Sequence, residues 1–132
     1  MFSPKIALLY RMSNQFAKWA AAFCKLLPDS EMAMHHRMFG LSQTIPGSVA
    51  MAGSKEPSSE IQKKYLRQAL ESACYFASLL TDITVGNPTD DDLVNEGKLV
   101  IDALITLLVD EVSSLVLTDA ETAEMKTIVM KQ

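Results

Sequence analysis

The chain has 132 residues, of which 48% are hydrophobic and only 7% aromatic, with five glycines, eight methionines and a net charge of -4. This length suits one ordinary domain with a real core and is too short for two. The composition favours helices over strands, so we expect a single all-α domain over residues 1–132.

The charge is divided unevenly along the chain. Residues 1–67 carry nine Lys or Arg and four acidic residues, a net charge of +5, whereas residues 68–132 carry three basic and twelve acidic residues, a net charge of -9. Such segregation favours either a local basic surface that attracts phosphates or contact between a basic and an acidic face.

The two cysteines, Cys24 and Cys74, are too few for a secreted disulfide framework and both fall in apolar helical stretches. We therefore expect buried thiols and a reducing, cytoplasmic compartment. Charged residues interrupt the apolar N-terminus, leaving only residues 6–10 as an uncharged apolar run before Arg11. We expect neither a signal peptide nor a membrane span.

The first predicted helix covers residues 5–27, where apolar side chains recur at three- and four-residue spacing until Pro28 ends it. The second is expected to begin near Asp29 or Ser30, either of which can cap it, and to run to Gly53. Its apolar positions keep helical spacing across a proline, so the helix should bend there and continue.

That proline is Pro46, in the stretch "IPGSVAMAGSK". Five residues, not four, separate Gly47 from Gly53, and Ser54 precedes Lys55, so the spacing and order of a phosphate-binding loop are absent. We interpret the small residues of this helix, including its glycines, as room for a neighbouring helix to approach closely.

A capping box of Ser59 and Gln62 opens the third predicted helix, and Thr89 with residues 90–92 begins the fourth. The fourth helix is apolar around most of its circumference, which suggests contact with another subunit. A second capping box at residues 118–121 starts a short tail, 118–132, that packs on the domain or frays. Together these elements predict an up-and-down four-helix bundle with a proline-bent second helix and a short C-terminal helical tail.

No pattern in the sequence indicates catalysis, a metal or a cofactor. His35 and His36 are adjacent, so on a helix they point about 100° apart and cannot grip one metal together. An all-α metal-dependent phosphohydrolase needs paired acidic motifs on two core helices, and only Glu121 with Glu124 has such spacing, in the tail. We expect a protein that is not an enzyme.

The candidate binding residues are basic. Three of them are seven residues apart and should form a ridge along the first helix. The full set for nucleic-acid or partner binding is Arg11, Lys18, Lys25, Lys55, Lys63, Lys64 and Arg67.

Two packing motifs carry a family resemblance. One is a bend similar to "SIP.(N/S)(I/V)A", formed by Ile45, Pro46, Ser48, Val49 and Ala50. The other is a "(Y/F)L..A..S" stretch, formed by Tyr65, Leu66, Ala69 and Ser72. Over residues 5–117 the chain resembles a bacterial four-helix-bundle family that includes the protein encoded in intervening sequences of large-subunit ribosomal RNA genes and the accessory variability protein of diversity-generating retroelements.

"AGSK" at residues 52–55 is more similar to the retroelement branch, whereas Met51 and Ala52 replace an acid and a glycine that are usual in the ribosomal branch. The resemblance implies a ring, typically a pentamer, that binds RNA and, in the retroelement branch, a reverse transcriptase, without catalysis by the bundle. The alternative is a structural or protein-binding homo-oligomer in which the basic ridge of one subunit meets the acidic fourth helix of the next.

Overall fold

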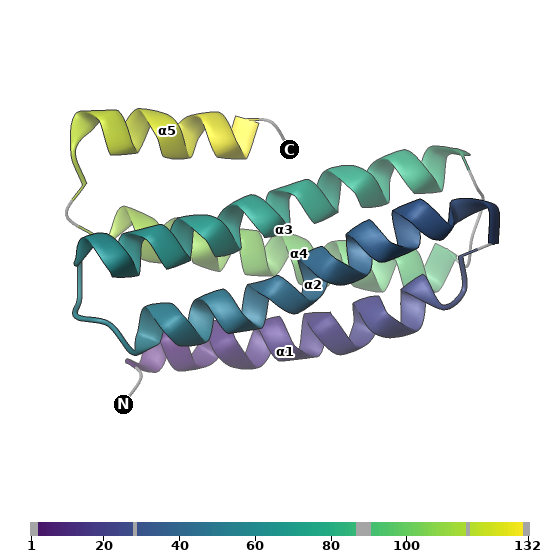
Figure 1. Cartoon of the computed structure of the whole chain (residues 1–132), viewed down its shortest axis with the longest axis horizontal. Coiled ribbons are helices and arrows are strands. Elements are labelled where there is room, and N and C mark those ends of the chain that lie inside the picture. Colours follow the sequence, from purple (N-terminus) through teal and green to yellow (C-terminus); the bar gives the residue numbers. More distant parts are fainter. Residues whose placement is uncertain (1–2, 28, 87–90, 116, 131–132) are drawn as a thin grey trace.

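The computed structural model describes residues 3–27, 29–86, 91–115 and 117–130 (Figure 1). Throughout these ranges the regular structure is helical, with five α-helices packed against one another and no β-strand. The all-α prediction is therefore confirmed.

Helix α1, Pro4–Cys24, begins with a side-chain cap and a proline in its first turn. The hydroxyl of Ser3 accepts a hydrogen bond from the backbone N–H of Ile6 at 3.2 Å, which satisfies one of the free donors at the helix start. The helix ends at Cys24, three residues before the predicted Leu27. Pro28, which we expected to end it, lies outside the described residues.

The expected start of the second helix at Asp29 or Ser30 is wrong. These two residues and Glu31 form a short 3-10 turn, Asp29–Glu31, and α2, Met32–Gly53, follows it. Glu31 occupies the N-cap position without a side-chain capping bond. The tight i to i+3 turn takes up the residues that could have capped the helix.

Helix α2 continues through Pro46, so the predicted continuation is confirmed and the "IPGSVAMAGSK" stretch is helical as far as Gly53. Ile45 and Val49, on either side of the proline, are completely buried. The interpretation of the glycines is wrong for Gly40 and Gly47, since a Cβ added at either would meet no atom of another element within 4 Å. The small residues of α2 that do face the core are Ser42, Ser48 and Ala52.

The remaining helices are α3, Glu60–Gly86, α4, Asp91–Ser113, and α5, Asp119–Met130. Helices α1 to α4 contact one another in a closed cycle, α1 with α2, α2 with α3, α3 with α4 and α4 with α1. Within the described residues α1 and α3 make no close backbone contact, so they occupy diagonal positions. The expected caps of α4, Thr89 and Asp90, lie outside the described residues.

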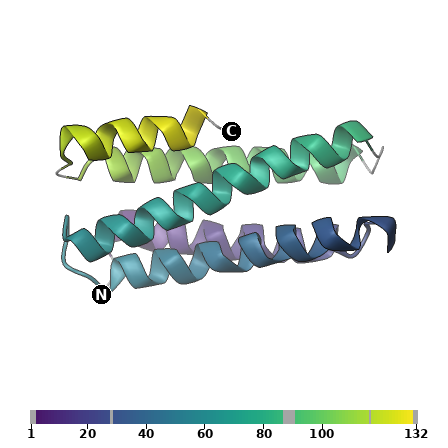
Figure 2. The same ribbon diagram turned by 45° about the horizontal axis from the view of Figure 1, so that its top comes forward.

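Helix α5 lies outside this cycle, along the N-terminal half of α3 (Figures 1 and 2). In the part of the chain that the structure describes, α3 is the only helix to which the backbone of α5 comes close. None of the described α5 residues is fully buried, although Met125, Ile128 and Val129 pack partly against the core. The tail thus packs on the domain as a fifth helix.

The core centres on an aromatic cluster. Phe16 and Phe76 meet edge to face at 4.7 Å between ring centroids, and the ring of Trp19 stacks on Phe23 at 5.0 Å. The indole Nε1 of Trp19 donates a hydrogen bond to the carbonyl oxygen of Leu93 at 3.1 Å, which joins α1 to the start of α4. This one side chain therefore provides both apolar contact and a satisfied polar group.

Cys24 and Cys74 are buried, as predicted, and form no disulfide. Burial disfavours the charged thiolate and raises the pKa of each thiol to about 11. Neither is activated for nucleophilic chemistry at neutral pH. Among the described residues, no helix combines the length and the hydropathy needed to cross a bilayer.

Candidate nucleic-acid interface

The structure divides the seven predicted basic residues between two surfaces. One, which we call the α1 ridge, consists of Arg11, Lys18 and Lys25. The other, which we call the α3 cluster, consists of Lys55, Lys63, Lys64 and Arg67. Because α1 and α3 occupy diagonal positions, the two groups do not form one continuous surface on a single chain.

The α1 ridge is exposed along its whole length. Seven residues of helix rise about 10.5 Å, so the three cations are spaced along about 21 Å of the helix surface. The apolar stripe of α1, with Phe16 and Phe23 in the core, leaves the ridge on the solvent side. Among the described residues, Arg11, Lys18 and Lys25 form no ion pair. Their charges are available to a ligand.

The α3 cluster begins at a turn that Gln62 holds in place. The Gln62 Oε1 accepts a hydrogen bond from the Ser58 N–H at 2.7 Å, and Nε2 donates to the carbonyl of Ala52 at 3.2 Å. The Gln62 N–H donates to the Ser59 hydroxyl at 3.1 Å, as the predicted capping box requires, but the glutamine side chain reaches Ser58 and not Ser59. Buried Gln62 thus fixes the end of α2 against the start of α3.

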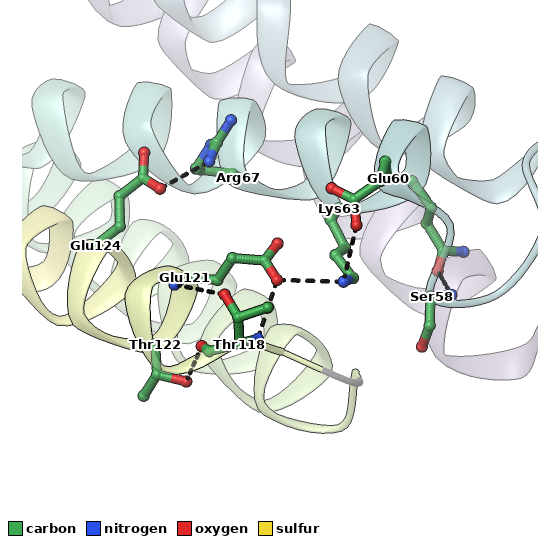
Figure 3. Close-up of polar contacts among 9 residues, drawn as sticks. Ser58, Glu60, Lys63, Arg67, Thr118, Glu121, Thr122 and Glu124 are labelled. Carbon is green, nitrogen blue, oxygen red and sulfur yellow. Dashed lines mark hydrogen bonds and ion pairs between the residues drawn. The ribbon is translucent and has the colours of Figure 1, made fainter.

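Two members of the α3 cluster are already paired with α5 (Figure 3). Lys63 Nζ lies 3.2 Å from Glu121 Oε1 and 3.3 Å from Glu60 Oε1. One turn further along α3, Arg67 donates to Glu124 Oε2 at 2.9 Å. The side chain of Lys63 keeps only 12% of its exposure. Two of the four cations of this surface therefore face an acidic helix of their own chain.

The first turn of α5 holds Glu121 in position. The Thr118 N–H donates to Glu121 Oε1 at 3.0 Å and the Glu121 N–H donates to the Thr118 hydroxyl at 3.1 Å, which confirms the predicted capping box. The same carboxylate oxygen thus accepts from Thr118 and from Lys63. The backbone hydrogen bond from Thr118, and then Lys63, hold the pKa of Glu121 below its ordinary value.

The pKa of Lys63 moves in the opposite direction. Burial would lower the pKa of this ammonium group, but its hydrogen bonds and charge attraction with Glu121 and Glu60 outweigh burial and raise it. Both groups are charged over the whole neutral range, so the pair persists there.

The rest of the α3 cluster is more accessible. Lys64 is exposed and Lys55 is half-buried. Lys64 and Arg67 line a polar hollow of about 250 Å³ with Gln68, and its acidic groups are Glu71 and Glu124. The hollow can hold a phosphate-sized group, but a carboxylate from α5 forms part of its wall.

An apolar groove of about 590 Å³ runs beside α5. Leu70 of α3 and Val109 and Val112 of α4 line one side, and Met125 and Val129 of α5 line the other. The groove explains why α5 has no fully buried side chain among its described residues. The apolar face of α5 is not packed closely against α4.

Of the two histidines, His35 links two helices. His35 donates from Nδ1 to the carbonyl oxygen of Cys24 at 2.9 Å, which links the start of α2 to the end of α1. The neighbouring His36 ring lies 5.5 Å from the His35 ring. Within the described ranges, no three His, Cys, Asp or Glu side chains come close enough together to hold a metal ion.

Sequence reasoning missed the ion pairs of Glu121 and Glu124, since it considered Glu121 as a capping residue and the two together as a metal motif. A signal was present, because Lys63 and Arg67 are four residues apart and the two glutamates are three apart, so each pair lies on one helix face. Gly97 was missed as well. A Cβ there would overlap the indole of Trp19, so only glycine lets α4 approach α1 this closely.

Comparisons of the chain with protein-family models, with curated proteins and with solved structures gave no significant match.

Proposed function

We propose that this protein is a non-enzymatic accessory protein that binds RNA through the α1 ridge. The observation that carries the proposal is the row of three exposed cations at seven-residue spacing, unpaired with any acid among the described residues. Phosphate neutralisation is the dominant attraction in RNA binding, and three regularly spaced cations can each neutralise one phosphate.

The finer features of the proposal rest on the family resemblance. In this proposal α1 to α4 form an up-and-down four-helix bundle, several copies assemble into a ring, typically a pentamer, and a reverse transcriptase is the second partner. The closed cycle of contacts among α1 to α4 supports the bundle. A ring would repeat the α1 ridge around its circumference and multiply a modest affinity for each site.

The decisive experiment measures RNA affinity against salt. The probes are a structured RNA and a single-stranded RNA of the same length, titrated at several salt concentrations with the intact chain. The test variant removes the ridge by Arg11→Gln, Lys18→Gln and Lys25→Gln. The control removes two cations of the acidic half, Lys98→Gln and Lys126→Gln, which makes the chain more acidic by two charges, against three in the test variant.

We expect the slope of log affinity against log salt to become shallower by about 2 for single strands in the ridge variant, since each neutralised phosphate contributes about 0.7. The control variant should keep its affinity nearly unchanged. A folded chain without any salt-sensitive RNA binding would overturn the proposal. A chain that sediments as a monomer would contradict the ring.

The second candidate is a structural or protein-binding homo-oligomer without a nucleic-acid ligand. The ion pairs between α3 and α5 favour it, because they show that basic residues of the first half of the chain already pair with acidic residues of the second half. Leu99 on α4 is 73% exposed and offers an apolar contact for a second copy. An oligomer that persists when RNA binding is absent would select this candidate.

A further inference from the structure

We propose that α5 is an internal competitor for the α3 cluster, which is a second phosphate-binding surface of the same protein. Glu121 and Glu124 occupy the places that two phosphates of an RNA strand would take on Lys63 and Arg67. This inference deepens the proposed function and rests on it, since it concerns the same class of ligand.

The geometry matches a ligand mimic. The two carboxylates of α5 each meet a different cation of α3, at 3.2 Å for Lys63 and 2.9 Å for Arg67 (Figure 3). Charged oxygens at this distance from an ammonium and a guanidinium group make the same charge-assisted hydrogen bonds that phosphate oxygens make. While α5 is docked, Lys63 is largely covered and the hollow beside Lys64 is partly walled by Glu124.

The contact is weak enough for competition. No described side chain of α5 is fully buried, and its backbone comes close to α3 alone. The apolar groove leaves the side of α5 that faces α4 loosely packed. Arg67 and Glu124 keep 34% and 50% of their side-chain exposure, and ion pairs at such sites contribute little to stability. A phosphate backbone can therefore replace the carboxylates without unfolding the domain.

The test variant is Glu121→Gln with Glu124→Gln. Glutamine keeps the capping box at Thr118, because glutamine serves at this position as well as glutamate, while the charge is lost. The matched control is Asp102→Asn with Asp119→Asn, two exposed acids of α4 and α5 that form no ion pair among the described residues and change the net charge equally. The probe is a single-stranded oligouridylate RNA added to the intact chain.

We expect the test variant to bind this RNA about three- to tenfold more tightly than the unmodified chain, because it loses one exposed ion pair, with Arg67, and one largely covered ion pair, with Lys63. The control should bind within about twofold of the unmodified chain, because neither acid pairs with Lys63 or Arg67 and exposed charges are screened by salt. Binding that appears only in the test variant would support the competition by α5 but would overturn binding at the α1 ridge.

Two results would overturn the inference, and they differ in what becomes of the proposed function. If the unmodified chain binds RNA and the test variant binds equally, the competition is absent while the α1 ridge proposal stands. If no variant binds RNA, both the inference and the proposed function fail.

A second measurement, in the absence of RNA, tests whether α5 covers Lys63. In the unmodified chain Lys63 should be acetylated by a lysine reagent at least about fivefold more slowly than exposed Lys64, because it is covered and its raised pKa leaves less of the reactive neutral amine. In the test variant the two rates should converge. Equal rates in the unmodified chain would show that α5 does not cover Lys63 and would overturn the inference.

Discussion

Replacing Gly97 by alanine tests the closest approach between α1 and α4. The new Cβ would overlap three carbon atoms of the Trp19 indole. The ring cannot easily turn away, because it stacks on Phe23 and donates to the Leu93 carbonyl. Overpacking costs about 1–3 kcal/mol and loss of the hydrogen bond about 1 kcal/mol. The gain in helix propensity returns about 0.5–1 kcal/mol, so we expect a net loss of about 1–3 kcal/mol.

Urea unfolding followed by the fluorescence of the single tryptophan measures this loss directly. The matched control is Gly40→Ala, in an exposed part of α2 where an added Cβ meets nothing within 4 Å. Helix propensity should then stabilise the chain by about 0.5–1 kcal/mol. A second test repeats Gly97→Ala in a Trp19→Leu background, where its cost should largely disappear; because this background has no tryptophan, unfolding is followed there by circular dichroism of the helices. Stabilisation by Gly97→Ala in the original background would refute the close contact.

Three further predictions concern buried or paired polar groups. Gln62→Ala removes two side-chain hydrogen bonds, to the Ser58 N–H and the Ala52 carbonyl, that hold the α2–α3 turn. The free energy of unfolding in urea should fall by about 2 kcal/mol, and an unchanged value would contradict the role of Gln62 in the turn. Glu111→Met should raise the free energy of unfolding by about 1 kcal/mol, because one buried carboxylate oxygen of Glu111 has no hydrogen-bond partner among the described residues. A fall would show that this oxygen is satisfied. The pKa of Glu121 in the folded chain is lowered from its ordinary value of 4.5. Its charge therefore stabilises the docking of α5 fully above pH 4.5, and this stabilisation is lost as the pH falls through the lowered pKa. The chemical shift of the Thr118 amide should titrate with a midpoint below pH 4.5. A midpoint above pH 4.5 would show that the pKa of Glu121 is raised and not lowered.

The features that the sequence predicts well are local. The helical spacing of apolar residues identified α1 and α3, and it carried α2 correctly through Pro46. The capping box at Thr118 was also predicted, because all of its groups lie within one helical turn. The start of α2 was missed because several neighbouring residues can cap a helix equally well, and packing decides among them.

The features that the sequence did not predict depend on contacts between distant elements. Lys63 and Glu121 are 58 residues apart, and Arg67 and Glu124 are 57 apart, so no local pattern joins them. The constraint on Gly97 arises only when the Trp19 ring is placed on α1 opposite it. Basic residues could therefore be identified as candidates, but which of them are covered by acidic partners follows from the packing of the helices.

The net charge of -4 does not by itself argue against RNA binding at the α1 ridge. At physiological salt the Debye length is about 8 Å, close to the distance between the axes of two packed helices. The acids of α5 lie beyond α3, diagonal to α1, and their field at the ridge is largely screened. Acids of α4 are nearer, and there Asp110 pairs with Lys5 at 3.7 Å. The potential that a phosphate meets at Arg11, Lys18 and Lys25 is therefore set by these cations and the adjacent helices, which makes ridge removal a sharper test than any change in total charge.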